Sequence, residues 1–239
     1  MKNIKSPVIV ALDFRSLAEA LSLVDTLNPA DCRVKIGKEL FTVAGPDSVK
    51  HLVDRGFDVF LDLKFHDIPN TVRNACLAAA DLGCWMLNVH TSGGKTMMEK
   101  AANALSALES APILIGVTTL TSLDNVALKE IGINESTETH TLRLASLAQE
   151  CGLAGVVSSP LEVSLMRERL GSKFLFVTPG VRPLGASVDD QARIATPSEA
   201  IAYGASYLVV GSPITSAPNP ATALAAIKEE LQHYKIPTT

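Results

Sequence analysis

The stretch Val59-Phe-Leu-Asp-Leu-Lys-Phe-His-Asp-Ile-Pro-Asn-Thr71 sets charged side chains directly after a short apolar run. If residues 59–64 form a strand, side chains alternate between its faces, so Asp62 and Lys64 point the same way where the strand ends. Asp67 follows on the loop. Opposite charges on one face form either a structural ion pair or a polarised catalytic site, and these residues alone do not choose between the two.

The same pattern, an apolar run followed by polar side chains, occurs eight times along the chain. Such runs are typical of strands buried on both faces of a parallel sheet, and the segments between them are long enough for crossover helices. The eight predicted strands span residues 8–13, 33–37, 58–64, 86–90, 113–119, 155–159, 174–180 and 207–212.

Helix-capping residues mark the segments between these strands. Three segments carry the capping-box pattern, a serine or threonine followed three residues later by glutamate. These pairs are Ser16 with Glu19, Ser159 with Glu162, and Thr196 with Glu199. Asn219-Pro220 opens the last predicted helix in a similar way. Five glycines stand where helices should end, as a left-handed C-cap favours, at positions 56, 83, 152, 171 and 204.

Eight strand–helix units in 239 residues predict an α/β fold, the (β/α)8 or TIM barrel, which typically takes about 250 residues. An open doubly wound sheet is the alternative, but Asp13-Phe-Arg-Ser16 stands where such a sheet would carry its glycine-rich fingerprint. No linker or shift in composition divides the chain, so residues 1–239 are expected to form one domain.

The composition favours a small molecule as the partner. The net charge is only -4 and no long basic run occurs, which argues against nucleic acid or an anionic membrane. No apolar run approaches the roughly 20 residues of a spanning helix, and the start lacks a signal-peptide pattern, so a cytoplasmic protein is expected. The cysteines and histidines show no metal-ligand spacing, so no metal site is predicted.

Polar residues also stand near the carboxyl ends of the other predicted strands, where the chemistry of a (β/α)8 barrel takes place. They are Asp13, Lys35, Asn88, His90, Thr118, Thr119, Thr121, Thr178, Arg182 and Ser212. Lysines and aspartates that converge there would polarise the cavity, because unit charges about 4 Å apart interact by about 4 kcal/mol at an effective dielectric of about 20. Such an array can hold a proton donor beside an anion. Nothing in the sequence orients His66 or His90 as a general base.

Residues 181–193, after the seventh predicted strand, are rich in glycine, serine and aspartate and are expected to form a mobile lid. In (β/α)8 enzymes the loops after strands seven and eight often build a phosphate site from backbone N–H groups. Arg182, Gln191 and the Gly211 amide are therefore candidate phosphate ligands.

The Asp-x-Lys-x-x-Asp pattern at residues 62–67, completed through Thr71, resembles the signature of the orotidine 5'-phosphate decarboxylase family. The resemblance extends over nearly the whole chain, with further motifs in the family's order. These motifs are Val8-Ile-Val-Ala-Leu-Asp13, Val34-Lys-Ile-Gly37, Thr119-Leu-Thr-Ser122, Val177-Thr-Pro-Gly-Val-Arg182, Asp190-Gln-Ala-Arg193 and Val209-Val-Gly211.

The resemblance implies decarboxylation of orotidine 5'-phosphate to uridine 5'-phosphate, the last step of UMP synthesis, without a cofactor and in a homodimer. Lys64 would donate a proton to C6 of the pyrimidine. It would belong to an alternating array of charges with Lys35, Asp62 and Asp67, of which Asp67 would come from the other subunit.

The resemblance also implies how the nucleotide is held. Asp13 and Lys35 would bind ribose hydroxyls, helped by Thr71 of the other subunit, and Thr121 would contact the pyrimidine. At the phosphate, the ligands would be Arg182, Gln191 and the Gly211 backbone, together with Ser212, which follows Gly211.

One position departs from the family's pattern. After Gly211 the family usually has arginine, whereas this chain has Ser212-Pro213. A serine donates one hydrogen bond and brings no charge, and a lost charge-assisted contact would cost about 1.5–3 kcal/mol or more. Either Arg182 or Arg193 compensates for the missing arginine, or the affinity for phosphate is weaker, or the residue at position 212 was changed.

Two other functions stay open. Hexulose-phosphate synthases and keto-gulonate-phosphate decarboxylases share the Asp-x-Lys-x-x-Asp core but use Mg²⁺ and other substrates; residues 68–71 and Thr121 argue against them. From another class, Ser212 permits a barrel that binds a nucleotide phosphate without catalysis.

Overall fold

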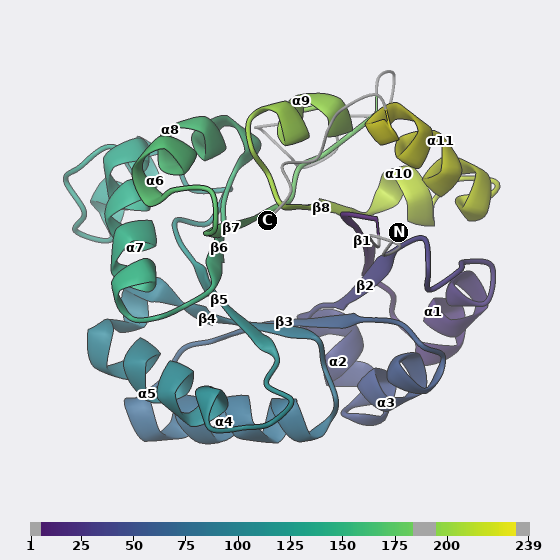
Figure 1. The fold of residues 1–239 in the computed structure, drawn as a ribbon, viewed down its shortest axis with the longest axis horizontal. Helices are drawn as coiled ribbons and strands as arrows, with labels where there is room; N and C mark the ends of the chain where they lie inside the picture. The colour runs from purple at the N-terminus through teal and green to yellow at the C-terminus, as the bar shows by residue number, and fades with distance from the viewer. Residues whose placement is uncertain (1–5, 184–194, 233–239) are drawn as a thin grey trace.

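A computed structural model describes residues 6–183 and 195–232, which form a closed barrel of parallel strands inside a ring of helices (Figure 1). Each strand pairs with the next along the chain, and β8 pairs with β1, so the predicted (β/α)8 fold is confirmed. The strands are β1 (Val8–Leu12), β2 (Arg33–Ile36), β3 (Val59–Phe65), β4 (Met86–His90), β5 (Ile113–Val117), β6 (Gly155–Val157), β7 (Leu175–Thr178) and β8 (Tyr207–Val210).

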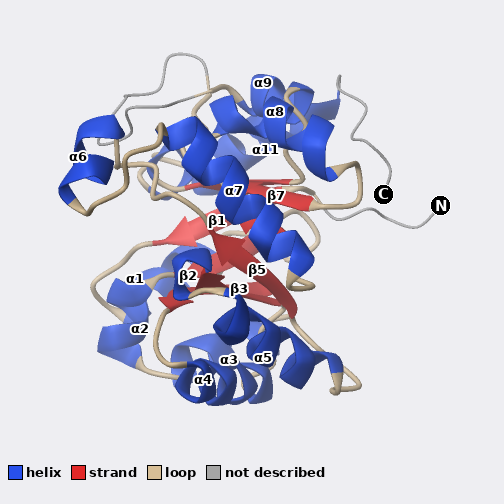
Figure 2. Ribbon diagram, turned by 90° about the vertical axis from the view of Figure 1, so that its left-hand side faces the viewer, coloured by secondary structure: helices blue, strands red, loops and turns tan. Residues whose placement is uncertain are grey.

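Helices cover the outside of the barrel on all sides, as the view in Figure 2 also shows. They are α1 (Leu17–Val24), α2 (Lys38–Ala44), α3 (Asp47–Asp54), α4 (Pro69–Asp81), the 3-10 turn η1 (Thr91–Gly93), α5 (Lys95–Ser106), α6 (Asn125–Glu130), α7 (Thr137–Glu150), α8 (Pro160–Leu170), α9 (Pro197–Ala202), α10 (Ser212–Thr215) and α11 (Pro220–Gln232). Within the described part of the chain, no helix combines the length and the apolar character needed to span a bilayer.

The predicted helix boundaries agree with the structure. Ser159 and Thr196 both form complete capping boxes with the glutamate three residues later, and the Ser16 side chain accepts from the Glu19 N–H. The five glycines predicted to end helices all have positive φ. Local chemistry therefore sets where the helices begin and end.

Six strands end one or two residues earlier than predicted, because the last residues of each predicted strand lie outside the hydrogen-bond ladder. Asp13 and Gly211, for example, lie just past β1 and β8. The strand β4 ends at the predicted residue, and β3 continues one residue beyond its predicted end, to Phe65. Asp13, Thr121 and Arg182 therefore stand on loops that follow strands, whereas Lys35, Asp62 and Lys64 remain within β2 and β3.

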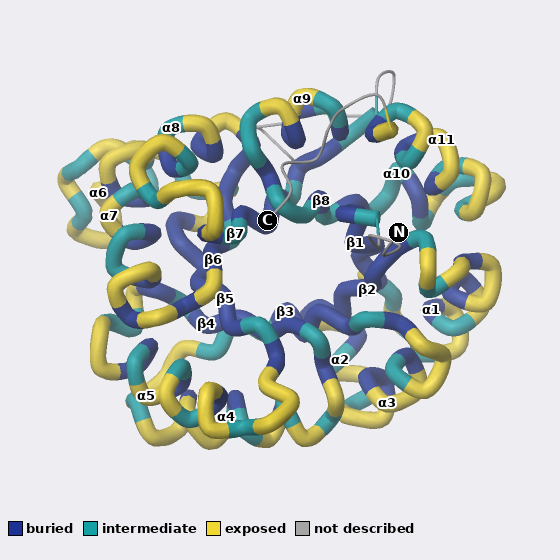
Figure 3. Tube along the Cα trace, in the orientation of Figure 1, coloured by how far each residue is buried: buried dark blue, intermediate teal, exposed yellow. Residues whose placement is uncertain are grey.

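The core has two layers. Outward-facing strand residues pack against the helices, whose inner faces are buried while their outer faces are exposed (Figure 3). A smaller apolar cluster from five of the strands fills the inside of the barrel and consists of Ile9, Phe60, Met86, Ile115 and Val177. The inside of the barrel is therefore packed with apolar side chains, and the cavity described below opens at the mouth.

The side chains of all four cysteines are buried. Burial raises the pKa of Cys76 and of Cys84 to about 12. These thiols stay protonated at neutral pH and serve packing.

Candidate active site

A cavity of about 530 Å³ opens at the carboxyl ends of the strands. Its wall includes the predicted site residues Asp13, Lys35, Asp62, Lys64, Thr121, Arg182, Gly211 and Ser212. Phe60 and Val177 of the inner cluster form part of its lining and separate it from the barrel interior. The barrel thus brings together residues that lie up to 199 positions apart, from Asp13 to Ser212.

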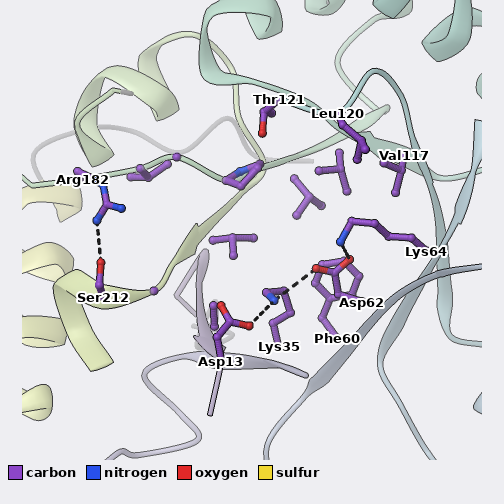
Figure 4. A pocket seen from close by; sticks show the side chains of 18 of the residues that line it. Asp13, Lys35, Phe60, Asp62, Lys64, Val117, Leu120, Thr121, Arg182 and Ser212 are labelled. Atoms are coloured by element: carbon purple, nitrogen blue, oxygen red, sulfur yellow. Dashed lines mark hydrogen bonds and ion pairs between the residues drawn. The ribbon is translucent and has the colours of Figure 1, made fainter. Parts of the chain in front are cut away.

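Charged groups of alternating sign form a continuous row across one side of this cavity (Figure 4). The Lys35 Nζ lies 3.2 Å from Asp13 Oδ1 and 3.4 Å from Asp62 Oδ2. The Lys64 Nζ donates to Asp62 Oδ1 at 2.7 Å. The convergence of these four side chains, predicted from the strand ends, is present in the structure.

Asp62 is the centre of this row and is 9% exposed. Burial raises the pKa of its carboxyl, but the charges of Lys35 and Lys64 and the hydrogen bonds from Lys64 and Asn88 outweigh burial, so the pKa lies below its ordinary value. Asp62 is therefore a carboxylate at neutral pH, held beside two lysine side chains and facing the cavity.

The end of β3 departs from a regular strand. Leu61 pairs with Leu87 of β4, but the next paired residue is Phe65, opposite Val89, so three residues of β3 face one of β4. Within this bulge, Lys64 has φ 54°, the one positive φ of a non-glycine residue in the described ranges. Such a conformation costs roughly 1–2 kcal/mol.

The strand over residues 59–64 is therefore not regular up to its end. Asp62 and Lys64 nevertheless line the same cavity, as alternation predicts. Nothing in the sequence indicated the bulge or the residue that supports it. Asn88 of β4, noted only as a polar strand end, accepts from the Lys64 N–H at 2.8 Å and donates to Asp62 Oδ1 at 2.7 Å.

A second polar group lies across the cavity from Lys64. The Arg182 Nη1 donates to the Ser212 Oγ at 2.9 Å, between the ends of β7 and β8 (Figure 4). Among the described residues, a Cβ on Gly211 would meet only the Ala11 Cβ, at 3.8 Å, so these residues leave space beside Gly211. Gln191 and Arg193 lie outside the described residues, as does most of the expected lid, residues 181–193.

Asp67 and Thr71 are exposed and do not line the cavity of their own chain. Asp67 Oδ1 accepts from the Ile68 N–H at 2.6 Å, at the start of α4. Their predicted contribution to a neighbouring subunit stays a prediction.

His66 and His90 form a tilted ring pair beside the site, with centroids 5.4 Å apart. Burial lowers the pKa of His90 to about 4, and the nearby His66, Lys38 and Lys64 act in the same direction. His90 is therefore neutral at pH 7. Neither ring is part of the lining of the cavity.

Known proteins resemble this chain over nearly its whole length. Residues 6–227 match the family described as "Orotidine 5'-phosphate decarboxylase / HUMPS family". An orotidine 5'-phosphate decarboxylase of Nitrosococcus oceani is 56% identical over 96% of this chain and 99% of its own, and one of Actinobacillus succinogenes is 56% identical over 95% and 98%.

A solved structure shares the fold. The crystal structure of orotidine 5'-phosphate decarboxylase from Lactobacillus acidophilus superposes with a TM-score of 0.85 at 43% identity, covering 95% of this chain and 99% of that one. The sequence match and the superposition both span the barrel that carries the row of charges. The chain therefore belongs to the orotidine 5'-phosphate decarboxylase / HUMPS family.

Proposed function

We propose that this protein removes CO₂ from orotidine 5'-phosphate and releases uridine 5'-phosphate. The relatives of 56% identity carry the name of this activity over nearly the full chain. The observation that carries the proposal is the row Asp13–Lys35–Asp62–Lys64, which sets a lysine and a fixed carboxylate side by side in the cavity.

Lys64 is proposed as the proton donor. The bond between C6 and the carboxylate breaks with its electron pair left on C6, CO₂ departs, and the Lys64 ammonium gives a proton to that carbon. The lysine then regains a proton from water. Because the pyrimidine ring cannot delocalise this carbanion well, the fixed charges of the site supply the stabilisation. Asp62 orients the Lys64 ammonium and presents negative charge toward the departing carboxylate.

The remaining cavity residues are proposed to hold the nucleotide. Asp13 and Lys35 bind ribose hydroxyls, and Thr121 contacts the pyrimidine. The phosphate lies across the cavity, near Arg182 and the Gly211–Ser212 backbone, with Gln191 contributing from outside the described residues. Binding energy from this remote phosphate positions the ring against Lys64.

The proposed active form is a homodimer. Asp67 and Thr71, exposed at the start of α4, are proposed to reach the cavity of the partner subunit. Asp67 would then extend the row of alternating charges beyond Lys64.

The proposal is tested by incubating purified protein with orotidine 5'-phosphate and measuring uridine 5'-phosphate and CO₂. Equal turnover with and without EDTA is expected. A Mg²⁺-dependent aldol or sugar-phosphate decarboxylase activity that EDTA abolishes would support the sugar-phosphate alternative. Tight binding of uridine 5'-phosphate without CO₂ release from the substrate would support a non-catalytic barrel.

A further inference from the structure

Asn88 lies in the middle of β4 and is fully buried. Its carboxamide makes two hydrogen bonds with β3, one to the Lys64 backbone and one to the Asp62 carboxylate. We propose that Asn88 is a positioning residue for the decarboxylation: it fixes the bulge of β3 so that Lys64 and Asp62 reach the substrate together. This inference rests on the proposed function.

The strand register shows why this side chain is needed. Asn88 is the single β4 residue opposite the three β3 residues between the Leu61 and Phe65 pairings. The Asn88 Oδ1 accepts a hydrogen bond from the Lys64 N–H at 2.8 Å and thus gives this backbone group of the bulge an acceptor. Lys64 has its positive φ at this point, and the hydrogen bond holds that backbone conformation.

The other end of the carboxamide sets the carboxylate. Since Oδ1 must accept from a backbone N–H, Nδ2 faces Asp62 as a donor, at 2.7 Å from its Oδ1. Asp62 Oδ1 also accepts from the Lys64 Nζ at 2.7 Å. The other carboxylate oxygen, Asp62 Oδ2, lies 3.4 Å from the Lys35 Nζ. One neutral side chain thus links the backbone that carries the proton donor to the anion beside it.

Substituting Asn88→Ala removes both links. We expect kcat for orotidine 5'-phosphate to fall about 10- to 100-fold, because small displacements of reacting groups are costly, while the Kd for uridine 5'-phosphate changes less than about threefold. Thr91→Val is the matched control: the Thr91 side chain is also fully buried and donates to the Val117 carbonyl at 2.8 Å, a hydrogen bond that involves none of the four charged side chains of the row. This control should lose stability while kcat stays near the wild-type value.

The pH dependence of Asn88→Asp separates positioning from a general loss of structure. While its new carboxyl group is protonated, it would donate to Asp62 and accept from the Lys64 N–H, which repeats the pattern of asparagine. As pH rises, this proton is lost and two adjacent carboxylates repel. Asp62 and Lys64 contact this position, Lys35 contacts Asp62, and His90 lies two residues along β4. We expect the variant's kcat, relative to wild type, to fall from pH 5.5 to about 9.

A second readout does not depend on turnover. Hydrogen exchange at the Lys64 N–H, followed by NMR, should be at least about tenfold faster in Asn88→Ala than in wild type and unchanged in Thr91→Val. If the wild-type protein did not decarboxylate orotidine 5'-phosphate, the proposed function would be wrong. The exchange rate at the Lys64 N–H would still show whether Asn88 holds the bulge. Wild-type kcat with unchanged exchange in a folded Asn88→Ala protein would overturn the role of Asn88 alone.

Discussion

At the scale of single residues, Ser212 stands where the resemblance to the family leads us to expect an arginine, and the structure places Arg182 against it. The Arg182 guanidinium donates to the serine hydroxyl at 2.9 Å, at the side of the cavity opposite Lys64. Arg182, one of the two arginines expected to compensate, thus lies at this place, and Arg193 belongs to the residues that the structure does not describe. We infer that Arg182 supplies the positive charge for the phosphate and that Ser212 orients it.

This inference predicts different effects of neighbouring substitutions. Arg182→Ala should raise KM for orotidine 5'-phosphate about 10- to 100-fold, the size of a lost charge-assisted contact, and Ser212→Ala about 3- to 10-fold. Arg55→Ala, an exposed arginine that ends α3 beyond the site, controls for the loss of one charge. Ser212→Arg should change KM less than about threefold. A large fall in KM for Ser212→Arg would show that the phosphate contact was missing.

His90 gives a second prediction, for stability against pH. Its pKa is about 4 in the folded protein and ordinarily 6.5, so between these values the unfolded chain binds the extra proton. The free energy of unfolding should therefore fall as pH drops from 6.5 to 4, by less than about 1.4 kcal/mol per pH unit because the ring is only partly buried. In His90→Gln this decline should be shallower. Urea unfolding at several pH values measures the free energy of unfolding of both proteins. An equal dependence on pH in wild type and His90→Gln would contradict the attribution of this decline to His90.

At the scale of elements, the turn from β2 into α2 supports the row of charges. A Cβ on Gly37 would lie 3.1 Å from Asp13 Oδ1 and 3.2 Å from the Lys35 Nζ. Its backbone, with φ -92° and ψ -176°, suits any residue, so crowding alone explains the need for glycine. The absence of a side chain here leaves room for the Asp13–Lys35 pair.

Gly37→Ala should therefore disturb substrate binding more than folding. Because the added methyl group displaces Lys35 from Asp13, KM for orotidine 5'-phosphate should rise about 3- to 10-fold, while Tm shifts by less than about 3 °C. Steady-state kinetics and thermal unfolding of the same preparation test both parts. A loss of Tm without a change in KM would assign Gly37 to folding instead.

The elements also show which features a sequence can predict. Strands and helix ends follow from residues close in the chain, such as the Thr196–Glu199 capping box. The bulge in β3 depends on pairing with a strand 24 residues away, and Asp62 and Lys64 still line one cavity, as alternation predicts. The role of Asn88 was missed for the same reason, because its partners are set by register and not by sequence spacing.

At the scale of the whole molecule, the barrel separates stability from chemistry. At the end opposite the cavity, the Arg33 guanidinium stacks on Trp85 and Tyr207, 4.5 and 5.0 Å from their ring centroids, and pairs with Asp58 at 3.3 Å. The apolar inner cluster lies between this group and the mouth. Charged residues at the mouth can thus be arranged for catalysis while the rest of the barrel holds them in place.

A site shared between subunits predicts complementation. Lys64→Ala and Asp67→Ala should each be nearly inactive as pure proteins. After the two are mixed and allowed to exchange subunits, mixed dimers hold one site with wild-type Lys64 and wild-type Asp67, so about one quarter of wild-type activity should return. As a control, mixing Lys64→Ala with Asp62→Ala should restore no activity. Each chain supplies both Asp62 and Lys64 to its own site, so every site in the mixed dimers lacks one of the two. Failure of the first mixture despite subunit exchange would place Asp67 outside the neighbouring site.

The most direct measurement for the central claim is kcat/KM of Lys64→Ala with orotidine 5'-phosphate, beside the Kd of the same variant for uridine 5'-phosphate. Without the proton donor next to Asp62, kcat/KM should fall at least about 10³-fold while the product still binds, since the contacts at the phosphate and ribose remain. Decarboxylation by Lys64→Ala at a rate close to wild type would contradict the assignment of Lys64 as the proton donor.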